Sequence, residues 1–277
     1  MTPSLSALRE KAHGIRRTTL ELCIHAGKGH LSSCLSCTDM LVALYHGGGM
    51  RHDPGNPDWE QRDRFVLSKG QASPVLYAIL ADLGYFDPRE LQYFAKPNGI
   101  FGVHLQMDVP GVEITAGSLG QGFGTAAGMA LAAKMNRENH LTYALLGDGE
   151  LYEGSIWETA MFVAHNRLNN LVTLVDRNFQ CVTDFTENIL ALESIEAKFS
   201  AFGFNTIRLD GHSMEALVSA LIPLRNRPRS RPTVIIADTV KGAGVKTICH
   251  DPLWHGVAPQ GKTADQCLMD LEENHGH

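Results

Sequence analysis

Apolar and polar positions along the chain follow two repeats, one typical of helices and one typical of short buried strands. Residues 5–26 carry apolar side chains at helical spacing, which predicts a helix that stops at the glycines beyond it. Short β-like runs predict a buried strand at 64–67 and further strands at 143–146, 171–175, 205–209 and 233–237. Further helices are predicted at 39–45, 73–83, 120–134, 153–165 and 213–224, with a loop at 46–58 and one short helix within 87–106.

The order of these elements indicates the fold class. Strands that alternate with helices predict an α/β fold with a doubly wound, mostly parallel sheet and helices on both faces. The chain has 277 residues and 44% hydrophobic content, which is enough for a single domain over 1–277 with a full core. The tail after about residue 260 is polar, and we expect it to be loosely held.

Charge and composition limit the classes of partner and the cellular compartment that we expect for this protein. The net charge is −6, and no basic run carries interleaved aromatic residues, so nucleic acid is not an expected partner. No apolar stretch approaches the length of a membrane span, and six scattered cysteines favour a reduced, cytoplasmic protein. Cys34 and Cys37 have the spacing of a redox or zinc pair, but no second pair follows them, which favours two buried thiols.

Polar residues follow the ends of two neighbouring predicted strands. Gly147-Asp148-Gly149 follows one apolar run, and Asn178 follows the next, thirty positions after Asp148. A βαβ unit brings the carboxyl ends of its strands side by side, so Asp148 and Asn178 can meet there. Their oxygens suit Mg²⁺ or Ca²⁺, and Gly147 and Gly149 let backbone approach a phosphate. The pattern predicts a metal ion that bridges the protein to a diphosphate, although such a turn alone is about as often an ordinary surface turn.

Further motifs accompany this one in a defined order. They are Gly-Lys-Gly-His at 27–30, Arg-Asp-Arg-Phe-Val-Leu-Ser-Lys-Gly at 62–70, Gly-Ser-Leu-Gly-Gln-Gly at 117–122, Lys-Gly-Ala-Gly at 241–244 and Trp-His-Gly at 254–256. Their order and spacing resemble transketolase, specifically its N-terminal, diphosphate-binding half, from about residue 16 to about 259. The resemblance implies the thiamin-diphosphate-binding fold and thiamin diphosphate held through Mg²⁺ or Ca²⁺. It also implies transfer of a two-carbon ketol unit from a ketose or ketose phosphate to an aldehyde.

The resemblance assigns the metal and diphosphate contacts to particular positions. Asp148, Asn178 and the main-chain carbonyl of Gln180 would bind the metal, so the Gln180 side chain would have no part in that role. Gly149 would present its N–H to the diphosphate. Lys241 would lie near the diphosphate, although a solvated lysine before a glycine-rich turn is nearly as consistent with the sequence.

Four further positions are expected to face the cofactor or a neighbouring subunit. Leu119 and Gln121 would line the cofactor cleft, and the backbone that begins at Gly117 would contact the aminopyrimidine. Glu153 would lie at a dimer interface, in a network that joins two active sites. The alternative for Glu153 is a carboxylate stabilised by the dipole at the start of a helix.

Three histidines match positions that handle the substrate in the family. His30 would face the reacting carbon of the sugar, His104 would contact the aminopyrimidine side and a hydroxyl of the donor, and His255 would reach the diphosphate and the substrate. Three imidazoles in one cleft suit proton transfer near neutral pH. The alternative for each, strongest for His255, is a hydrogen-bonded cleft histidine without a proton role.

The chain departs from the family pattern on the substrate side. Gln71 stands where the family has a histidine, and glutamine can form hydrogen bonds but cannot titrate. Leu31-Ser32-Ser33 replaces the usual Pro-Gly, and the stretch after Asn178 lacks its usual glycine. We expect intact cofactor binding with altered substrate or reaction specificity. A catalytically impaired homologue is the weaker alternative.

The length of the chain bears on whether it can act alone. A whole transketolase has two further domains, one of which supplies the glutamate that activates the aminopyrimidine. We therefore expect the N-terminal subunit of a two-component enzyme, or else a fragment. Its partner would be a C-terminal transketolase subunit with the pyrimidine-binding domain, in an α2β2 heterotetramer that acts on small sugars or sugar phosphates. The alternatives are a thiamin-diphosphate carboligase or acyl-transfer subunit with an unusual acceptor, and a non-catalytic regulatory homologue, against which the intact Asp148 and Asn178 argue.

Overall fold

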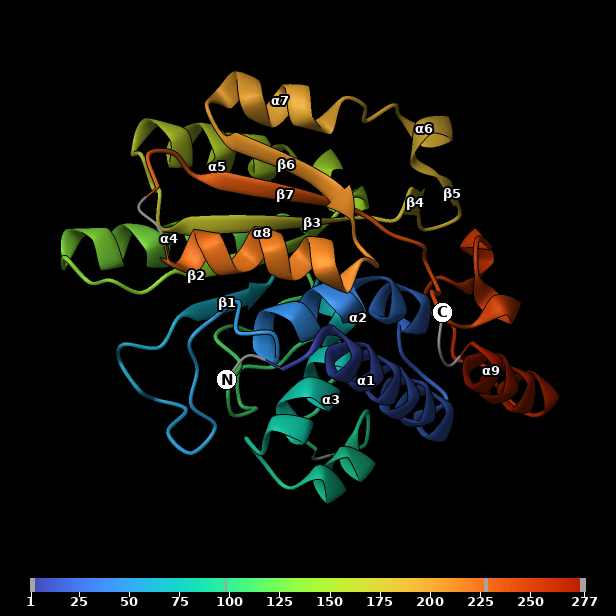
Figure 1. The fold of residues 1–277 in the computed structure, drawn as a ribbon. Helices are drawn as coiled ribbons and strands as arrows, with labels where there is room; N and C mark the ends of the chain where they lie inside the picture. Colours follow the sequence, from blue (N-terminus) through green and yellow to red (C-terminus); the bar gives the residue numbers. More distant parts are fainter. Residues whose placement is uncertain (1–2, 98, 227–228, 275–277) are drawn as a thin grey trace.

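A five-stranded parallel sheet forms the centre of the molecule in the computed structural model, which describes residues 3–97, 99–226 and 229–274 (Figure 1). Its strand order is β1-β2-β3-β7-β6, and every adjacent pair is parallel. The bounds are β1 Arg64–Leu67, β2 Thr142–Gly147, β3 Leu171–Arg177, β7 Thr233–Asp238 and β6 Asn205–Asp210. The predicted α/β fold class and all five predicted strands are confirmed.

Helices cover both faces of the sheet, and alternate strand residues pack against the two layers (Figure 1). One layer contains α1 Leu5–Ala26, α2 Leu31–Tyr45, α3 Ser73–Leu83 and α8 Met214–Asn226. The other contains α4 Gln121–Met135, α5 Gly154–His165 and α7 Ile195–Phe202. In β2, for example, Leu145 belongs to the first core and Leu146 to the second. Burial on both faces explains why β2 and β3 at the centre of the sheet are nearly continuous apolar runs.

Short elements gather where the strands end, at the right of Figure 1. They include the hairpin of β4 Gln180–Cys181 and β5 Asp184–Phe185, with α6 Thr186–Ile189 after it. The chain also contains short 3₁₀ helices, which are η1 Gly70–Ala72, η2 Pro88–Tyr93, η3 Gly149–Tyr152, η4 Lys246–Ile248 and η5 Pro252–Trp254. The edge at which β2, β3 and β7 end is therefore roofed by loops and short turns, which is where ligands bind in open α/β sheets.

Two boundaries differ from expectation. Helix α2 begins at Leu31 rather than Asp39, because its small serine and cysteine side chains are buried among neighbouring elements even though they carry no apolar periodicity. The loosely held tail is wrong over Lys262–Glu273, which forms α9. Cys267 and Leu271 of α9 pack against residues of α1 and the 245–248 turn, so a narrow apolar stripe anchors a mostly polar helix. Residues 275–277 of the predicted tail lie outside the described part.

Leu271→Ala tests how firmly α9 is anchored. Leu271 is 1% exposed, so its truncation should leave a cavity and lower the free energy of unfolding by about 2–4 kcal/mol. Met269 on the same helix is 52% exposed, and Met269→Ala should change stability by less than about 0.5 kcal/mol. Urea unfolding followed by circular dichroism measures both. Equal effects would mean that α9 is not held through its buried stripe.

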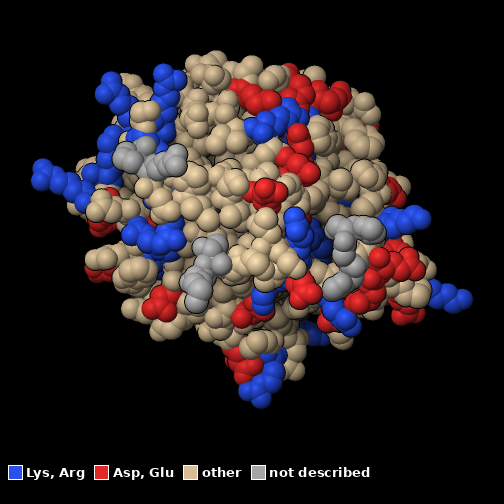
Figure 2. Space-filling model, in the orientation of Figure 1, with Lys and Arg blue, Asp and Glu red and all other residues tan. Residues whose placement is uncertain are grey.

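Other expectations concern thiols, membranes and surface charge. All six cysteines are free, and Cys34 and Cys37 are buried, as expected. Within the described ranges, none of the helices combines the length and apolar character needed to cross a bilayer. Figure 2 shows basic and acidic side chains interspersed on one face of the molecule.

Candidate active site

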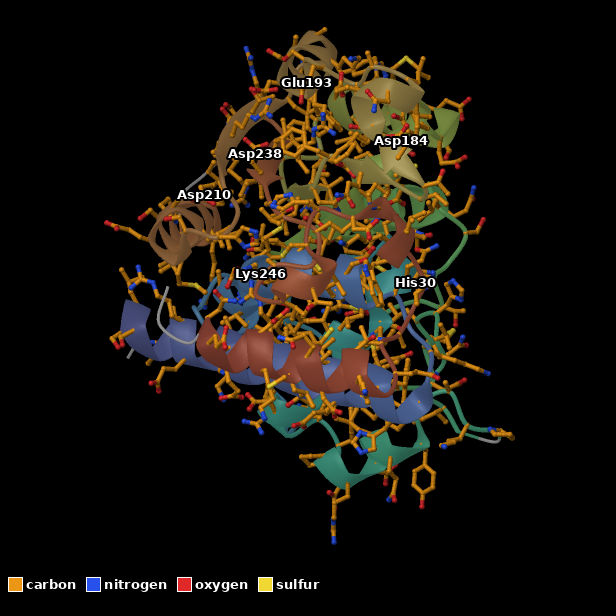
Figure 3. The ribbon with its side chains drawn as sticks, turned by 90° about the vertical axis from the view of Figure 1, so that its right-hand side faces the viewer. His30, Asp184, Glu193, Asp210, Asp238 and Lys246 are labelled. Carbon is orange, nitrogen blue, oxygen red and sulfur yellow. The ribbon has the colours of Figure 1, made fainter. Side chains whose placement is uncertain are left out.

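Asp148 and the 178–180 loop meet at the carboxyl edge of the sheet, which faces the viewer in Figure 3. β2 and β3 are paired so that Gly147 lies opposite Asp176, and the next residues enter the two loops together. The Asp148 N–H donates to the Asp176 carbonyl (3.2 Å), and the Phe179 N–H donates to Asp148 Oδ2 (2.6 Å). The structure thus brings together the two loops that the sequence pattern predicted to meet.

Asp148 is a buried carboxylate with partners on both oxygens. Oδ1 accepts from the Gly149 N–H (2.8 Å), and Oδ2 accepts from Arg177 Nη1 (3.1 Å). Burial and the nearby charge of Asp176 raise the pKa of Asp148 to about 6, although Arg177 and the Phe179 N–H oppose the shift. A divalent cation at this position would supply further compensating charge.

The second loop presents an amide oxygen beside Asp148. Asn178 Nδ2 donates to Asp176 Oδ2 (3.2 Å), which fixes the orientation of the amide, and Oδ1 accepts from the Gln180 N–H (3.1 Å). The side-chain Oε1 of Gln180 is buried and has no hydrogen-bond partner in the described part of the chain. This loop therefore offers oxygen ligands rather than nitrogen or sulfur.

The donor set fits a hard cation. Among the described residues, no group of three or more His, Cys, Asp or Glu side chains is arranged to hold a metal by itself. A cation bound by Asp148 and Asn178 must complete its coordination with backbone carbonyl, water or ligand oxygens. That is the usual situation of Mg²⁺ bound to a phosphorylated ligand.

The two glycines of the turn are close to their neighbours. A Cβ on Gly149 would lie 2.9 Å from Cys181 Sγ, so a larger residue would have to displace the Cys181 side chain of the neighbouring hairpin. The Gly147 N–H donates to Glu150 Oε2 (3.1 Å), and the Gly149 N–H donates to Asp148. Both N–H groups thus have acceptors within the protein, and the phosphate contacts predicted for the two glycines remain predictions.

The three predicted histidines lie together. The His30 ring centre is 5.4 Å from that of His104 and 5.4 Å from that of His255. Burial, His104 and Lys241 lower the pKa of His30 to about 4, and burial, Lys241 and His30 lower the pKa of His255 to about 4. Both imidazoles are thus neutral near pH 7, where they can accept a proton or form neutral hydrogen bonds. The Nδ1 atom of His30 is buried, and no described residue forms a hydrogen bond with it.

Lys241 links the histidine group to the metal side. Its Nζ lies 3.1 Å from His255 Nδ1 and is also within electrostatic reach of Asp148. An ammonium only donates, so His255 accepts at Nδ1 and carries its proton on Nε2. Lys241 is 2% exposed, and burial lowers its pKa. The alternative of a solvated lysine is therefore wrong.

The remaining predicted residues occupy the rim. Gln71 in η1 donates from Nε2 to the Gly117 carbonyl (2.9 Å), while its buried Oε1 accepts from none of the residues that the structure describes. A Cβ on Gly117 would lie 3.1 Å from the His104 ring, so the Gly117 backbone packs closely against His104 while it accepts the bond from Gln71. Leu119 is half-buried, whereas Gln121 at the start of α4 is exposed. The predicted role of Leu119 and Gln121 in lining the cofactor cleft remains a proposal.

Glu153 is an exposed residue at the N-terminus of α5. Its side chain makes no capping hydrogen bond. This position leaves the carboxylate available to a neighbouring subunit, and the predicted interface role remains a proposal.

Sequence reasoning missed a buried ionic network beneath the site. Lys69 Nζ pairs with Asp176 and donates to the Ser33 carbonyl (2.9 Å), while Thr239 and Ser36 donate to the same carboxylate. Lys69 lies just after β1, and Asp176 is the last residue but one of β3. A charged residue beside a buried strand could have indicated such a network in the sequence, because a buried charge requires a partner.

Glu150 is a second missed residue. It is 1% exposed, and its Oε1 accepts from Ser68 and from the Gly120 N–H (2.8 Å), while Oε2 accepts from Gly147. One carboxylate therefore joins the ends of β1 and β2 to the start of α4.

Comparison with known proteins decides the family. The model described as "Transketolase, thiamine diphosphate binding domain" matches residues 8–268. The chain belongs to the transketolase family. It is 42% identical, over 86% of each chain, to a 6-deoxy-6-sulfo-D-fructose transketolase subunit of Clostridium sp. (strain MSTE9). It is 34% identical to one subunit of the apulose-4-phosphate transketolase of Phocaeicola vulgatus, over 93% of this chain and 91% of that one.

Single-chain transketolases match over a smaller part of their length. Human transketolase is 35% identical over 96% of this chain but only 42% of its own length. The solved transketolase of Campylobacter jejuni superposes with a TM-score of 0.86 at 30% identity, over 93% of this chain and 41% of that one. The expected thiamin-diphosphate-binding fold and the N-terminal subunit of a split transketolase are confirmed. So is the expected class of enzyme, a transketolase-like transferase.

Proposed function

We propose that this chain binds the diphosphate end of thiamin diphosphate through Mg²⁺ and acts with a C-terminal transketolase subunit. The complex would transfer a two-carbon ketol unit from a ketose phosphate, or a similarly anionic ketose, to an aldehyde. One observation carries the proposal: Lys241 contacts His255 and lies near Asp148, so a cation-binding corner and a neutral histidine group share one edge of the sheet.

Each side chain has a role that its surroundings support. Asp148 and Asn178, with the Gln180 carbonyl, would hold the metal, and the buried ammonium of Lys241 would face the diphosphate. When bound, thiamin diphosphate supplies the electron sink for the carbon–carbon bond that breaks. His30 and His104 would orient substrate hydroxyls and accept or return their protons, because a neutral imidazole can do both. Gln71 would hold a substrate or cofactor atom through its free Oε1.

The proposed assembly is supported by the names of relatives. The relatives named as subunits support a C-terminal partner with the pyrimidine-binding domain, and we propose an α2β2 complex in which the exposed Glu153 lies at an interface. The six free thiols support a cytoplasmic location. Identification of the co-purified partner, followed by an assay of the complex for ketol transfer between sugar phosphates, tests the proposal. A complex that binds thiamin diphosphate but transfers no ketol unit to any aldehyde would contradict it.

A specialised acceptor is the second candidate, favoured by Gln71. Gln71→Ala should reduce kcat/KM by the loss of one or two hydrogen bonds, about 1–3 kcal/mol of transition-state binding. Gln71→His should move preference toward ordinary sugar phosphates and add a titrating group to the pH profile. Steady-state kinetics with xylulose 5-phosphate and ribose 5-phosphate measure both effects.

The matched control is Gln92→Ala, at an exposed glutamine of η2. It should leave the kinetics unchanged. If Gln71→His alters neither the substrate profile nor the pH dependence, Gln71 does not determine specificity.

A further inference from the structure

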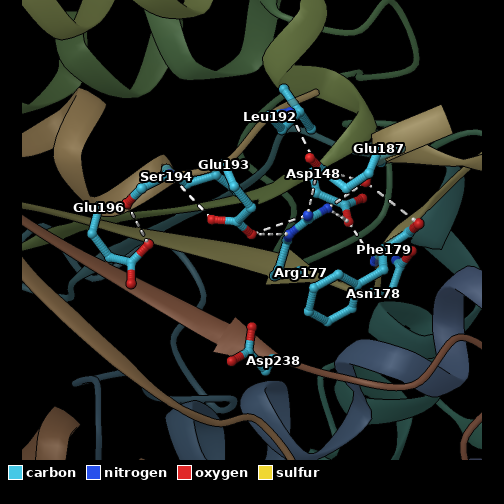
Figure 4. Close-up of polar contacts among 12 residues, drawn as sticks. Asp148, Arg177, Asn178, Phe179, Glu187, Leu192, Glu193, Ser194, Glu196 and Asp238 are labelled. Atoms are coloured by element: carbon cyan, nitrogen blue, oxygen red, sulfur yellow. Dashed lines mark hydrogen bonds and ion pairs between the residues drawn. The ribbon is translucent and has the colours of Figure 1, made fainter. Parts of the chain in front are cut away.

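A single buried guanidinium contacts both loops of the proposed metal site (Figure 4). Arg177 ends β3 and is fully buried, and its Nη1 donates to Asp148 Oδ2 (3.1 Å) and to Thr186 Oγ1 (2.6 Å). Nε donates to Glu193 Oε1 (3.1 Å), and Nη2 donates to Glu187 Oε1 (2.9 Å). All three nitrogens are engaged, as a buried arginine requires.

The same guanidinium holds the backbone between the other expected ligands. Its Cζ lies 4.1 Å from the centre of the Phe179 ring, and Phe179 separates Asn178 from Gln180. Phe179 has φ 65°, a left-handed conformation that is unfavourable for a bulky side chain. Stacking on Arg177 and the bond from the Phe179 N–H to Asp148 keep this residue in place.

We propose that Arg177 is the positioning residue of the divalent-cation site. It would fix Asp148 through Oδ2 and the 178–180 loop through Phe179, so that the oxygens of both loops face one ion. Oδ1 of Asp148 accepts only the Gly149 N–H among the described contacts and retains a lone pair for the metal. This inference rests on the metal site proposed above.

Neighbouring carboxylates make a positive charge beside a metal site tolerable. Glu187 and Glu193 both pair with Arg177 and offset its charge. Arg208 also pairs with Glu193 (3.3 Å) and with Asp238 (2.8 Å), but no contact joins it to Asp148 among the described residues. Arg208 therefore provides a matched control for the loss of an arginine from the same ionic group.

Mn²⁺ binding tests the role of Arg177 independently of turnover. The chain and its co-purified partner would be titrated with Mn²⁺ in the presence of thiamin diphosphate, and free Mn²⁺ measured by electron paramagnetic resonance. Arg177→Met should weaken Mn²⁺ binding about 10–100-fold, as the loss of a group that orients a metal ligand does. Arg208→Met should change it less than about 5-fold, since partly exposed ion pairs contribute little.

Two further variants separate positioning from simple destabilisation. Arg177→Lys keeps the charge but lacks the planar fork, so Mn²⁺ binding should still weaken more than in Arg208→Met. Phe179→Gly, combined with Arg177→Met, should recover part of the lost affinity because glycine adopts the left-handed backbone freely. If Arg177→Met does not fold, the Arg177→Lys comparison decides.

The outcomes distinguish this inference from the proposed metal site. Mn²⁺ affinity in the folded Arg177 variants that equals or exceeds that of the unmodified chain overturns the positioning role. If Asp148→Ala abolishes Mn²⁺ binding at the same time, only the role of Arg177 fails. If Asp148→Ala binds Mn²⁺ normally, the proposed metal site itself fails.

Discussion

Asp148→Ala should weaken metal-dependent binding of thiamin diphosphate by more than about 100-fold. Asp148 would be a direct ligand, and even the outer partners of metal ligands are worth about 10–100-fold in affinity. Without the cation, the diphosphate would approach a carboxyl edge that still carries Asp176 and Glu150, both buried. Isothermal titration calorimetry of the chain with its partner, with and without Mg²⁺, measures the loss.

The controls address folding. Asp148 pairs with the buried Arg177, and the loss of one member of a buried ion pair destabilises a protein by about 3–5 kcal/mol. Asp148→Asn keeps the side-chain shape and should retain more stability while still weakening Mg²⁺ binding. Asp265→Ala removes an exposed carboxylate of α9 and should bind the cofactor normally. Unchanged cofactor affinity in folded Asp148→Ala would exclude Asp148 as a metal ligand.

The purified chain without a partner should show no ketol transfer, and addition of the C-terminal subunit should raise the rate by at least about 100-fold. The chain spans only 42% of human transketolase. The family's activating glutamate belongs to the pyrimidine-binding domain, and loss of such a proton-transfer group costs about 10²–10⁴-fold. A coupled assay with sugar phosphates before and after reconstitution measures the difference.

Mass spectrometry must show that the purified chain is free of the partner. Asp148→Ala chain mixed with the same partner serves as the inactive control, because its turnover should stay at background. Robust turnover by the unaccompanied chain would refute the two-component model.

The strands could be predicted from the sequence because the pattern that identifies each strand lies within a few consecutive residues. Parallel strands buried on both faces are short apolar runs, and most of β1, β2, β3 and β7 has this form. The edge strand β6 is more exposed and more polar, and its alternating apolar residues Ile207 and Leu209 indicated it instead. The start of α2 and the whole of α9 were missed for opposite reasons. The first is built of small side chains without periodicity, and the second carries a narrow apolar stripe within a polar composition.

Some residues of the candidate site could be predicted from the sequence and others could not. Asp148, Asn178 and the histidines stand in motifs whose spacing identifies them, and the structure gathers His30, His104 and His255 as expected. The supporting ionic contacts join positions far apart in the chain. Lys69 and Asp176 are 107 residues apart, and no short pattern links them. Such pairs become visible only when the strand order is known.

Helix α2 has a consequence for redesign of the enzyme. All fifteen of its residues are buried, and His30 stands directly at its N-terminus. Directed evolution toward a new sugar would find few tolerated changes along this helix, since each enlargement must displace a packed neighbour. Adaptive substitutions should instead accumulate in the irregular segment 100–120, which carries His104 and faces Gln71 through Gly117. One side of the site, helix α2, should therefore tolerate few substitutions, whereas the segment 100–120 on the other side should tolerate more.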